Sequence, residues 1–415
     1  MKLLVGSLYF EPDHSGIAVY ANDLAAYLVE HDHEVTVVTG FPFYPQWKKR
    51  AEDQGRVSAT DSWKGIRILR SYVYVPRVVS TLSRIVHELS FALFAIIGFV
   101  RAGRHDAIVV LSPPLLLAAV AVPFKYLWNA RLVSHIQDLQ PDAALSLNMI
   151  RSGLVGRILL ALEAFVYRHS DLVVTISDGM HQRILGKGVP ADRLVMFPNW
   201  IDLDAHSTPR ERAAFRRRHP HLEGKFLVAY AGNVGVKQGL DVLVRAADEA
   251  RASETVHFLI IGDGADMPRI REMAASRELT NLTLLPFMDT AEYFDMLADV
   301  DVSFIAQRPG VGEVFFPSKL LGIMAAGRAS IVAADASSEL AYVVAGGEAG
   351  LVVGPDDAAG VARAAIFLAA HRARLEEMEA GARRTVRQYD RKAVLAGLLA
   401  EITADVPAPV GALVN

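Results

Sequence analysis

The feature that most constrains the fold of this chain is a series of short, continuously apolar runs that alternate with helical patterns from end to end. Examples are KLLVGSLYF (residues 2–10), EVTVVTG (34–40) and VHFLIIGDG (256–264). Unbroken apolar runs of this length are typical of parallel strands whose two faces are both covered by helices. One intervening segment, SGIAVYANDLAAYLVEHD (15–32), has helical periodicity and begins with Ser15 as a candidate N-cap. The alternation predicts an α/β protein with doubly wound parallel sheets.

The strands fall into two groups, which indicates two domains. A chain of 415 residues is too long for one ordinary core and suits two domains of roughly 200 residues each. The stretch 198–224 turns polar and charged before the next apolar run, so we expect an N-terminal domain at 1–198 and a C-terminal domain at 199–388. A final helix and tail at 389–415 would cross back to the first domain. Strands are expected at 2–10, 34–40, 66–73, 106–112, 131–138, 171–177, 225–233, 256–264, 282–287, 300–306 and 329–335.

Composition excludes several classes of function. The formal net charge is −3, with 43 basic and 46 acidic residues, which argues against binding of nucleic acid. The absence of cysteine excludes disulfides, thiolate-bound metals and thiol nucleophiles. The histidines show no zinc-binding spacing, and we expect no metal or other cofactor. The N-terminus does not have the pattern of a signal peptide, so a cytoplasmic location is expected.

Two stretches are unusually apolar, LSFALFAIIGFV (89–100) and LLLAAVAVPF (115–124). Neither reaches the roughly 18–20 residues needed to span a bilayer. Two interpretations remain open: buried helices of the α/β layers, or helices with an apolar face on an anionic membrane, peripheral to its inner surface. The basic residues around these stretches are Arg77, Arg84, Arg101, Arg104, Lys125 and Arg131.

Two loops at predicted strand ends have the residues of anion sites. The first, AYAGNVGVKQGLD (229–241), places Gly232, Asn233 and Lys237 between a buried strand and a helix. Lys237 could neutralise a diphosphate as a point charge, although a surface lysine on a flexible turn is the alternative. The second has Ser318 and Lys319 ahead of a short apolar helix that ends at Gly327. Ser318, Lys319 and the first-turn amides, including that of Leu320, would form an anion site facing Lys237, unless Ser318 is a simple N-cap.

Two further glycine-containing loops give weaker signals. Ser15 and Gly16 join the first strand to the first helix, where backbone can approach a ligand closely. Gly262, in IIGDGAD, belongs to an incomplete dinucleotide-binding pattern. The aromatic, proline-rich segment FPFYPQW (41–47) follows a strand end, and its Tyr44 and Gln46 are candidates for an acceptor platform or parts of a packed loop.

The chain resembles the retaining glycosyltransferases of the GT-B fold, family 4 group, and among them the colanic acid and exopolysaccharide biosynthesis enzymes. The matching pieces run nearly from end to end. They are YFEPDHSGIAVYANDLAAYLVEHDHEVTVVTGFPFYPQW, HIQDLQPDAA, FPNWID, GNVGVKQGLD, IIGDGAD and PSKLLGIMAAG. The resemblance implies two Rossmann-like domains that face a cleft, and metal-independent transfer of a hexose from a nucleotide-sugar donor to a lipid-linked or growing oligosaccharide.

The resemblance also implies roles for individual residues. Lys237 and Lys319 would hold the diphosphate, and Gly16 would meet it from the other domain. Phe287 would lie near the base, and Glu339 would bind a donor hydroxyl. His135 or Asp138 would contact the transferred sugar.

The chain departs from the family pattern at several positions, and one departure is that the first phosphate loop has Lys237 without the usual arginine. Glu313 is one residue out of register with a sugar-binding glutamate, and Gly322 stands where a ribose-binding glutamate is usual. The usual His-Asp pair reads Gln137-Asp138, with His135 two residues earlier on the same strand face. A GT-B-shaped sugar-nucleotide epimerase is one alternative. The loss of the glutamate at Gly322 leaves open a second, a non-catalytic nucleotide-binding subunit of a polysaccharide assembly. The D-x-D pairs Asp299/Asp301 and Asp202/Asp204 are interpreted as ordinary surface carboxylates.

Overall fold

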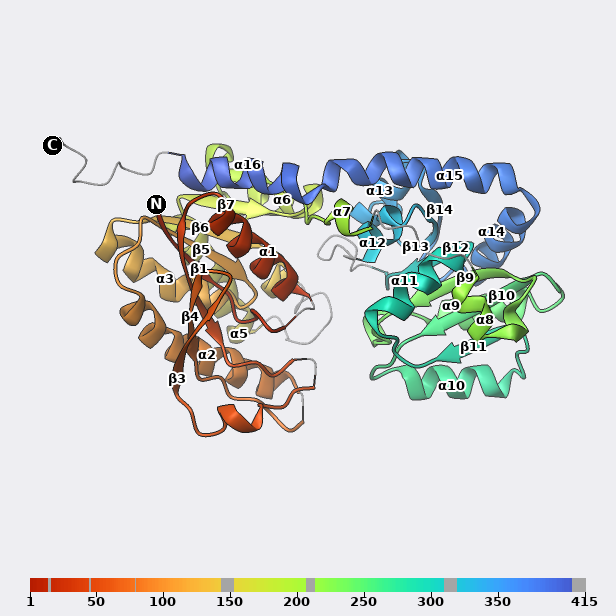
Figure 1. Ribbon diagram of the computed structural model, residues 1–415, viewed down its shortest axis with the longest axis horizontal. Coiled ribbons are helices and arrows are strands. Elements are labelled where there is room, and N and C mark those ends of the chain that lie inside the picture. Colours follow the sequence, from red (N-terminus) through yellow and green to blue (C-terminus); the bar gives the residue numbers. More distant parts are fainter. Residues whose placement is uncertain are drawn as a thin grey trace. The chain divides into compact units, whose positions relative to one another are not determined.

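The structure is a computed structural model that describes residues 1–13, 16–44, 46–78, 80–142, 153–206, 213–309 and 319–404. The chain divides into two compact units (Figure 1). Unit 1 comprises Met1–Asn199 together with Lys392–Asn415, and unit 2 comprises Trp200–Arg391. The sequence placed this division after residue 198.

Unit 1 is built on an eight-stranded sheet with the order β3-β4-β2-β1-β5-β6-β7-β8. All pairs are parallel except β3 with β4. The β1-α1-β2 and β5-α3-β6 connections run in opposite directions along this sheet. Because such connections between parallel strands are right-handed, α1 and α3 lie on opposite sides of the sheet (Figure 1). The strands are β1 (Lys2–Gly6), β2 (Glu34–Gly40), β3 (Ser58–Trp63), β4 (Ile66–Ser71), β5 (Ala107–Ser112), β6 (Arg131–Ile136), β7 (Leu172–Thr175) and β8 (Leu194–Met196). The helices are α1 (Ile17–Glu30), α2 (Thr81–Ala102), α3 (Leu115–Trp128), α5 (Leu154–His169), α6 (Asp178–Gly186) and α16 (Arg391–Thr403).

Unit 2 is built on a six-stranded parallel sheet with the order β11-β10-β9-β12-β13-β14. The strands are β9 (Phe226–Ala231), β10 (Val256–Ile261), β11 (Leu282–Leu285), β12 (Val302–Ala306), β13 (Ala329–Ala333) and β14 (Gly350–Val353). The helices are α7 (Leu203–His206), α8 (Ala214–Arg218), α9 (Asp241–Glu249), α10 (Met267–Ser276), α11 (Thr290–Asp299), α12 (Lys319–Ala325), α13 (Glu339–Gly346), α14 (Ala358–Ala370) and α15 (Arg372–Thr385).

The apolar strand sequences of unit 2 supply two separate cores. In β9, Phe226 and Val228 belong to one buried cluster with α9 and α14, whereas Leu227 and Ala229 belong to another with α12 and α13. Successive strand residues point to opposite faces of a sheet, so a strand that is apolar at every position can bury both faces. The doubly wound α/β class predicted from these runs is confirmed, with the antiparallel β3 as an exception.

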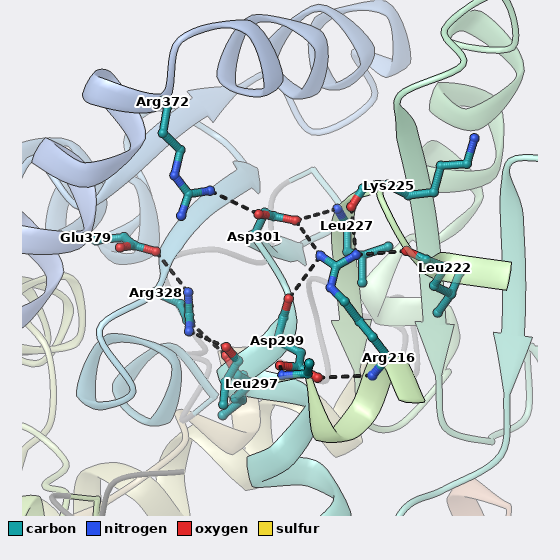
Figure 2. Close-up of polar contacts among 12 residues, drawn as sticks. Arg216, Leu222, Lys225, Leu227, Leu297, Asp299, Asp301, Arg328, Arg372 and Glu379 are labelled. Atoms are coloured by element: carbon teal, nitrogen blue, oxygen red, sulfur yellow. Dashed lines mark hydrogen bonds and ion pairs between the residues drawn. The ribbon is translucent and has the colours of Figure 1, made fainter. Parts of the chain in front are cut away.

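Asp299 and Asp301 lie just before the amino end of β12, where they bind the chain segment that leads into β9 (Figure 2). Asp299 is 8% exposed, and its carboxylate accepts hydrogen bonds from the backbone amides of Ala213, Phe215 (2.7 Å) and Arg216 (3.0 Å). Asp301 accepts from the Leu227 amide at 2.9 Å and from the Arg216 guanidinium at 3.0 Å. The interpretation of Asp299 as a surface carboxylate is therefore wrong, because it satisfies amides of the chain that leads into β9.

A second arginine completes this polar network. Arg328 donates to the Glu379 carboxylate at 3.1 Å and to the Leu297 carbonyl at 2.7 Å (Figure 2). It thereby ties the amino end of β13 to α11 and α15. The network lies at the amino edge of the parallel sheet, which is the edge opposite to the one where ligands of such sheets bind.

Candidate functional site

The carboxyl edge of the unit 2 sheet brings together two loops that the sequence singled out. Lys319 is the first residue of α12, and its Nζ donates a 2.7 Å hydrogen bond to the Tyr230 hydroxyl at the end of β9. The same ammonium group lies 4.2 Å from the centre of the Tyr230 ring. The Tyr230 hydroxyl in turn donates to the Asn233 carbonyl at 2.6 Å. This chain of contacts places the positive charge of Lys319 beside the glycine-rich loop that begins at Gly232.

The glycines of this edge are required by close packing. Gly232 has a φ of +136°, and a Cβ there would overlap the Nζ of Lys319. Gly262, with a φ of +141°, follows β10, and a Cβ there would overlap the Gly232 carbonyl oxygen. Residues with side chains rarely adopt such φ values, and here they would also lack space. Gly262 therefore packs against the loop of Gly232, and the Lys319 side chain lies where a Cβ of residue 232 would stand.

Sequence reasoning missed two side chains of this site. Tyr230 looked like one more apolar residue of a buried strand, and burial raises its pKa above the ordinary value, so its hydroxyl stays protonated. Arg308, just after β12, donates to the Val236 carbonyl at 3.1 Å and to the Asp241 carboxylate at 2.8 Å. It holds the loop that contains Lys237 onto the start of α9. No sequence pattern marks Arg308, because its partners lie about seventy residues away.

The remaining candidates of unit 2 are distributed along the same edge. Phe287 follows β11 and is 60% exposed, and Glu339 is the first residue of α13, which follows β13. The Leu320 side chain is fully buried in the hydrophobic cluster around α12 and α13, so only its backbone could bind a ligand. A Cβ at Gly322 would lie 3.9 Å from the Tyr293 hydroxyl, in ordinary contact.

Several predicted residues lie outside the described parts of the chain. They are Ser15, Glu313 and Ser318. Lys237 belongs to a short 3-10 helix, Val236–Gln238, but its side chain also lies outside the described atoms.

In unit 1, the candidates also lie at the carboxyl edge of the sheet. Gly16 is the N-cap of α1, with a φ of +59° and open space where a Cβ would stand. Tyr44, which is 37% exposed, packs edge-on against Tyr9 at 5.9 Å between ring centres, and Gln46 is exposed. Phe43 of the same segment is buried. The segment is thus a packed loop that leaves Tyr44 and Gln46 at its surface.

His135 does not fit the direct sugar contact considered for it. It lies inside β6, paired in register with Leu111 and Val174, and its side chain has no exposed surface. Gln137 Nε2 lies 3.3 Å from His135 Nδ1, so Gln137 stands between this ring and the strand end. Asp138 follows the strand and is only half-buried. Strand periodicity placed His135 and Gln137 on one face of the strand, but it could not reveal that His135 is covered there.

A carboxyl group that the sequence did not single out lies near the unit 1 edge. Glu88, on α2, accepts a 3.0 Å hydrogen bond from Gln140, which follows β6. Burial raises the pKa of Glu88 to about 6. Glu88 also helps to raise the pKa of Tyr9, after burial as the main cause. The segment after β6 therefore meets α2 at this carboxyl group, and Tyr9 lies within its electrostatic influence.

The buried histidines predict a loss of stability in mild acid. Burial lowers the pKa of His135 and that of His257 to about 4, from 6.5. Between pH 4 and pH 6.5 the unfolded chain binds protons at these two histidines that the folded chain does not. Their contribution to the free energy of unfolding is therefore full above pH 6.5 and falls as the pH approaches 4. Urea unfolding between pH 7 and pH 5 should show this decline. His135→Gln should reduce the slope of the free energy of unfolding against pH by up to about 1.4 kcal/mol per pH unit. Adding His257→Gln should reduce this slope again. An unchanged slope in both variants would contradict the assignment.

Among the described residues, no group of three or more histidine, aspartate or glutamate side chains is arranged to hold a metal ion. Asp202 instead accepts a 3.2 Å hydrogen bond from the Ala205 amide and caps the short helix α7.

Two domain families match the two halves of the chain. Residues 15–200 match the family described as "Glycosyl transferase 4-like domain", and residues 225–371 match "Glycosyl transferases group 1". Among curated proteins, the chain is 32% identical over 347 residues to a protein of Escherichia coli (strain K12) named as a colanic acid biosynthesis glycosyl transferase, WcaI. The match covers 82% of this chain and 85% of that protein.

Solved structures with the same fold cover nearly the whole chain. Sucrose-phosphate synthase from Thermosynechococcus elongatus matches with a TM-score of 0.72 at 18% identity, over 96% of this chain and 97% of the other. The Anabaena protein Alr3699/HepE, crystallised with UDP-glucose, matches with a TM-score of 0.70 at 15% identity, over 97% of this chain and 100% of the other. These similarities show the two-domain GT-B fold.

Proposed function

This chain belongs to the glycosyltransferases with a 4-like domain and a group 1 domain, and from that premise we propose that it transfers a sugar from a nucleotide diphosphate donor to a hydroxyl group of a lipid-linked or growing glycan. The reaction would retain the anomeric configuration. The donor would bind at the carboxyl edge of the unit 2 sheet, and the acceptor at that of unit 1. The pathway would be the synthesis of a cell-surface or secreted polysaccharide, which the name of the Escherichia coli relative supports.

The observation that carries the proposal is the position of Lys319 against Gly232. Cleavage of the bond between sugar and diphosphate leaves negative charge on the diphosphate oxygens. A positioned ammonium group stabilises that charge most when the site is fixed beforehand. The Tyr230 hydroxyl and ring hold the Lys319 ammonium in place, and the bare Gly232 backbone lets a phosphate approach it. Arg308 would keep the Lys237 loop in position next to the same anion.

The acceptor half of the proposal rests on the edge of unit 1. Tyr44 and Gln46 would offer an aromatic face and an amide to a sugar ring, and Asp138 would accept a hydrogen bond from a hydroxyl group. With the positive charge supplied by Lys319 and Lys237, we propose that transfer needs no metal ion. The enzyme would work in the cytoplasm, in contact with the inner face of the membrane.

The experiment follows the sugar itself. Radiolabelled nucleotide-sugars are incubated with the full chain and detergent-solubilised lipid-linked acceptors, with EDTA present. The proposal predicts label in the lipid extract, with the new linkage in the anomeric configuration of the donor by NMR. Label that stays in the nucleotide fraction but appears in a different sugar would instead indicate an epimerase.

A further inference from the structure

One turn of α2 contacts two segments at the carboxyl edge of the unit 1 sheet. The Arg84 guanidinium carbon lies 5.8 Å from the centre of the Trp47 ring, and the centre of the His87 ring lies 5.3 Å from it. Trp47 ends the aromatic segment that follows β2. The next residue of the helix, Glu88, accepts a 3.0 Å hydrogen bond from Gln140, which follows β6. This turn of α2 therefore joins the aromatic segment to the segment after β6.

The packing of α2 fixes the position of Glu88. Phe91 and Phe99 of this helix are buried, and α2 packs against β2 and β4. At Gly98, a Cβ would lie 2.7 Å from a methyl group of Val38 in β2, so helix and sheet are in close contact. Within the described residues, α2 contains the one stretch long and apolar enough to cross a membrane, but here it covers the sheet. A binding group on a helix held in this way keeps its geometry.

The Glu88 carboxylate can accept more hydrogen bonds than it has. An ionised carboxylate has about four acceptor sites, and in the part of the chain that the structure describes its one hydrogen-bond donor is Gln140. Gln140 in turn accepts a 2.7 Å hydrogen bond from the Leu115 amide, which holds its side chain in place. The Glu88 side chain is only half-buried, so a ligand can reach its second oxygen, Oε2.

The charges around Glu88 leave it ionised at neutral pH. Burial raises the pKa of Glu88 to about 6, while the Gln140 hydrogen bond and the Arg84 charge act in the opposite direction. His87 is neutral near pH 7, because burial lowers its pKa, and its Nδ1 lies 2.6 Å from the Tyr74 carbonyl oxygen. Since Arg84 offsets the negative charge of Glu88, the site favours a hydroxyl group over a metal cation.

Aromatic rings lie near the same carboxylate. Tyr9, which follows β1, is close enough for the Glu88 charge to help raise the pKa of its hydroxyl, after burial as the main cause. The Tyr9 hydroxyl therefore stays protonated and can donate a hydrogen bond. Its ring centre lies 5.4 Å from that of Phe43 and 5.9 Å from that of Tyr44. A few fixed polar groups among aromatic rings are typical of sites that bind small molecules.

We propose that Glu88 binds a hydroxyl group of the acceptor sugar and is a specificity-determining residue of this protein. Its Oε2 accepts the hydrogen of that hydroxyl group in a charge-assisted bond, and Tyr9 donates to the same sugar. An acceptor that lacks this hydroxyl group leaves the carboxylate without its partner, and sites of this kind reject such analogues strongly. The inference rests on the proposed function, because it assigns a residue to the acceptor edge of the same reaction.

The first test measures transfer by the full chain at pH 7 and pH 5, from a radiolabelled nucleotide-sugar to detergent-solubilised lipid-linked glycans of bacteria. In the wild type, the apparent KM for the glycans should rise about tenfold at pH 5, because Glu88 changes from mostly ionised to mostly protonated. Glu88→Gln keeps an acceptor oxygen for Gln140 but loses the charge. Its apparent KM at pH 7 should be raised about tenfold and should change little with pH.

Glu34→Gln is the matched control for this variant. Glu34 is an exposed residue at the amino end of β2, on the opposite edge of the same sheet. Its substitution should leave the apparent KM and its pH dependence as in the wild type, with thermal unfolding as a check on both variants. The same KM and the same pH dependence in Glu88→Gln and Glu34→Gln would overturn the proposal. A Glu88 that only held Gln140 would give that result, because glutamine preserves the hydrogen bond.

The second test needs no donor and no turnover, so its outcome is independent of the transfer reaction. The ¹³C signal of the Glu88 carboxyl group, assigned by its loss in Glu88→Gln, is titrated with and without the lipid-linked glycans. A hydroxyl group that binds the ionised form should lower the pKa of Glu88 from about 6 to about 5 or below. A pKa that the glycans leave unchanged would overturn the proposal, even if the chain transfers sugar. A lowered pKa in a chain that transfers nothing would support acceptor binding by Glu88 and contradict the proposed function.

Discussion

Replacing Lys319 with alanine is expected to slow nucleoside diphosphate release by at least tenfold, and by about a hundredfold if Lys319 acts as one fixed donor to the leaving group. The reason is the placement of its ammonium group between the Tyr230 hydroxyl and the bare backbone of Gly232. A tenfold loss corresponds to about 1.4 kcal/mol of transition-state stabilisation. The measurement is kcat/KM for the donor, with thermal unfolding as a check on the fold.

Lys225→Ala is the matched control for this prediction. Lys225 belongs to the same unit but precedes β9, at the opposite edge of the sheet, and its Nζ donates to the Glu254 carbonyl at 2.6 Å. Its loss should leave kcat/KM unchanged. Tyr230→Phe keeps the ring under Lys319 but removes the hydroxyl, so its effect should be smaller than that of Lys319→Ala. Equal activity in Lys319→Ala and Lys225→Ala would reject the diphosphate role of Lys319.

The largest effect on stability is expected from Asp299→Ala. Its carboxylate is buried and accepts hydrogen bonds from three backbone amides of one turn, those of Ala213, Phe215 and Arg216. Alanine would leave these amides without that acceptor, and each buried unsatisfied group costs about 1–3 kcal/mol. We therefore expect the free energy of unfolding to fall by at least about 2 kcal/mol. Hydrogen exchange of the Phe215 and Arg216 amides should accelerate.

Two substitutions separate this effect from the loss of any carboxylate. Asp248→Ala removes a half-exposed partner of Arg251 and Arg277, and such surface ion pairs contribute at most about 1 kcal/mol. Asp299→Asn retains one acceptor oxygen and should have an intermediate effect. If Asp299→Ala and Asp248→Ala lowered stability equally, Asp299 would not hold the turn before β9.

The sequence predicted those elements whose signal is local. Strands such as β9 and β10 are apolar at nearly every position because both faces are buried, and that pattern was sufficient to place them. Three strands were missed. β3, SATDSW, is a mostly exposed edge strand with a polar sequence, and β8 and β14 are only three and four residues long. Such segments acquire their conformation from a neighbouring strand, which no local pattern reveals.

The candidate site was predictable only in part. That the Gly232 and Lys319 loops lie near each other follows from parallel strands, whose carboxyl ends share one edge. The contributions of Tyr230 and Arg308 could not be predicted, because they depend on contacts between segments distant in sequence. The same is true of Asp299, whose D-x-D spacing suggests nothing about three amides more than eighty residues earlier. Burial of His135 likewise depends on the neighbours of β6 on both sides.

Nucleoside diphosphate release is the most direct test that this chain transfers sugar from a nucleotide donor. Wild-type protein and the Lys319→Ala variant are assayed with UDP-, GDP- and ADP-sugars and with lipid-linked acceptors from bacteria. The account predicts release from one class of donor by the wild type, which identifies the base, and a loss of at least tenfold in the variant. If no donor were turned over and calorimetry detected no binding of any nucleotide, the assignment of a nucleotide-sugar site to this chain would be contradicted.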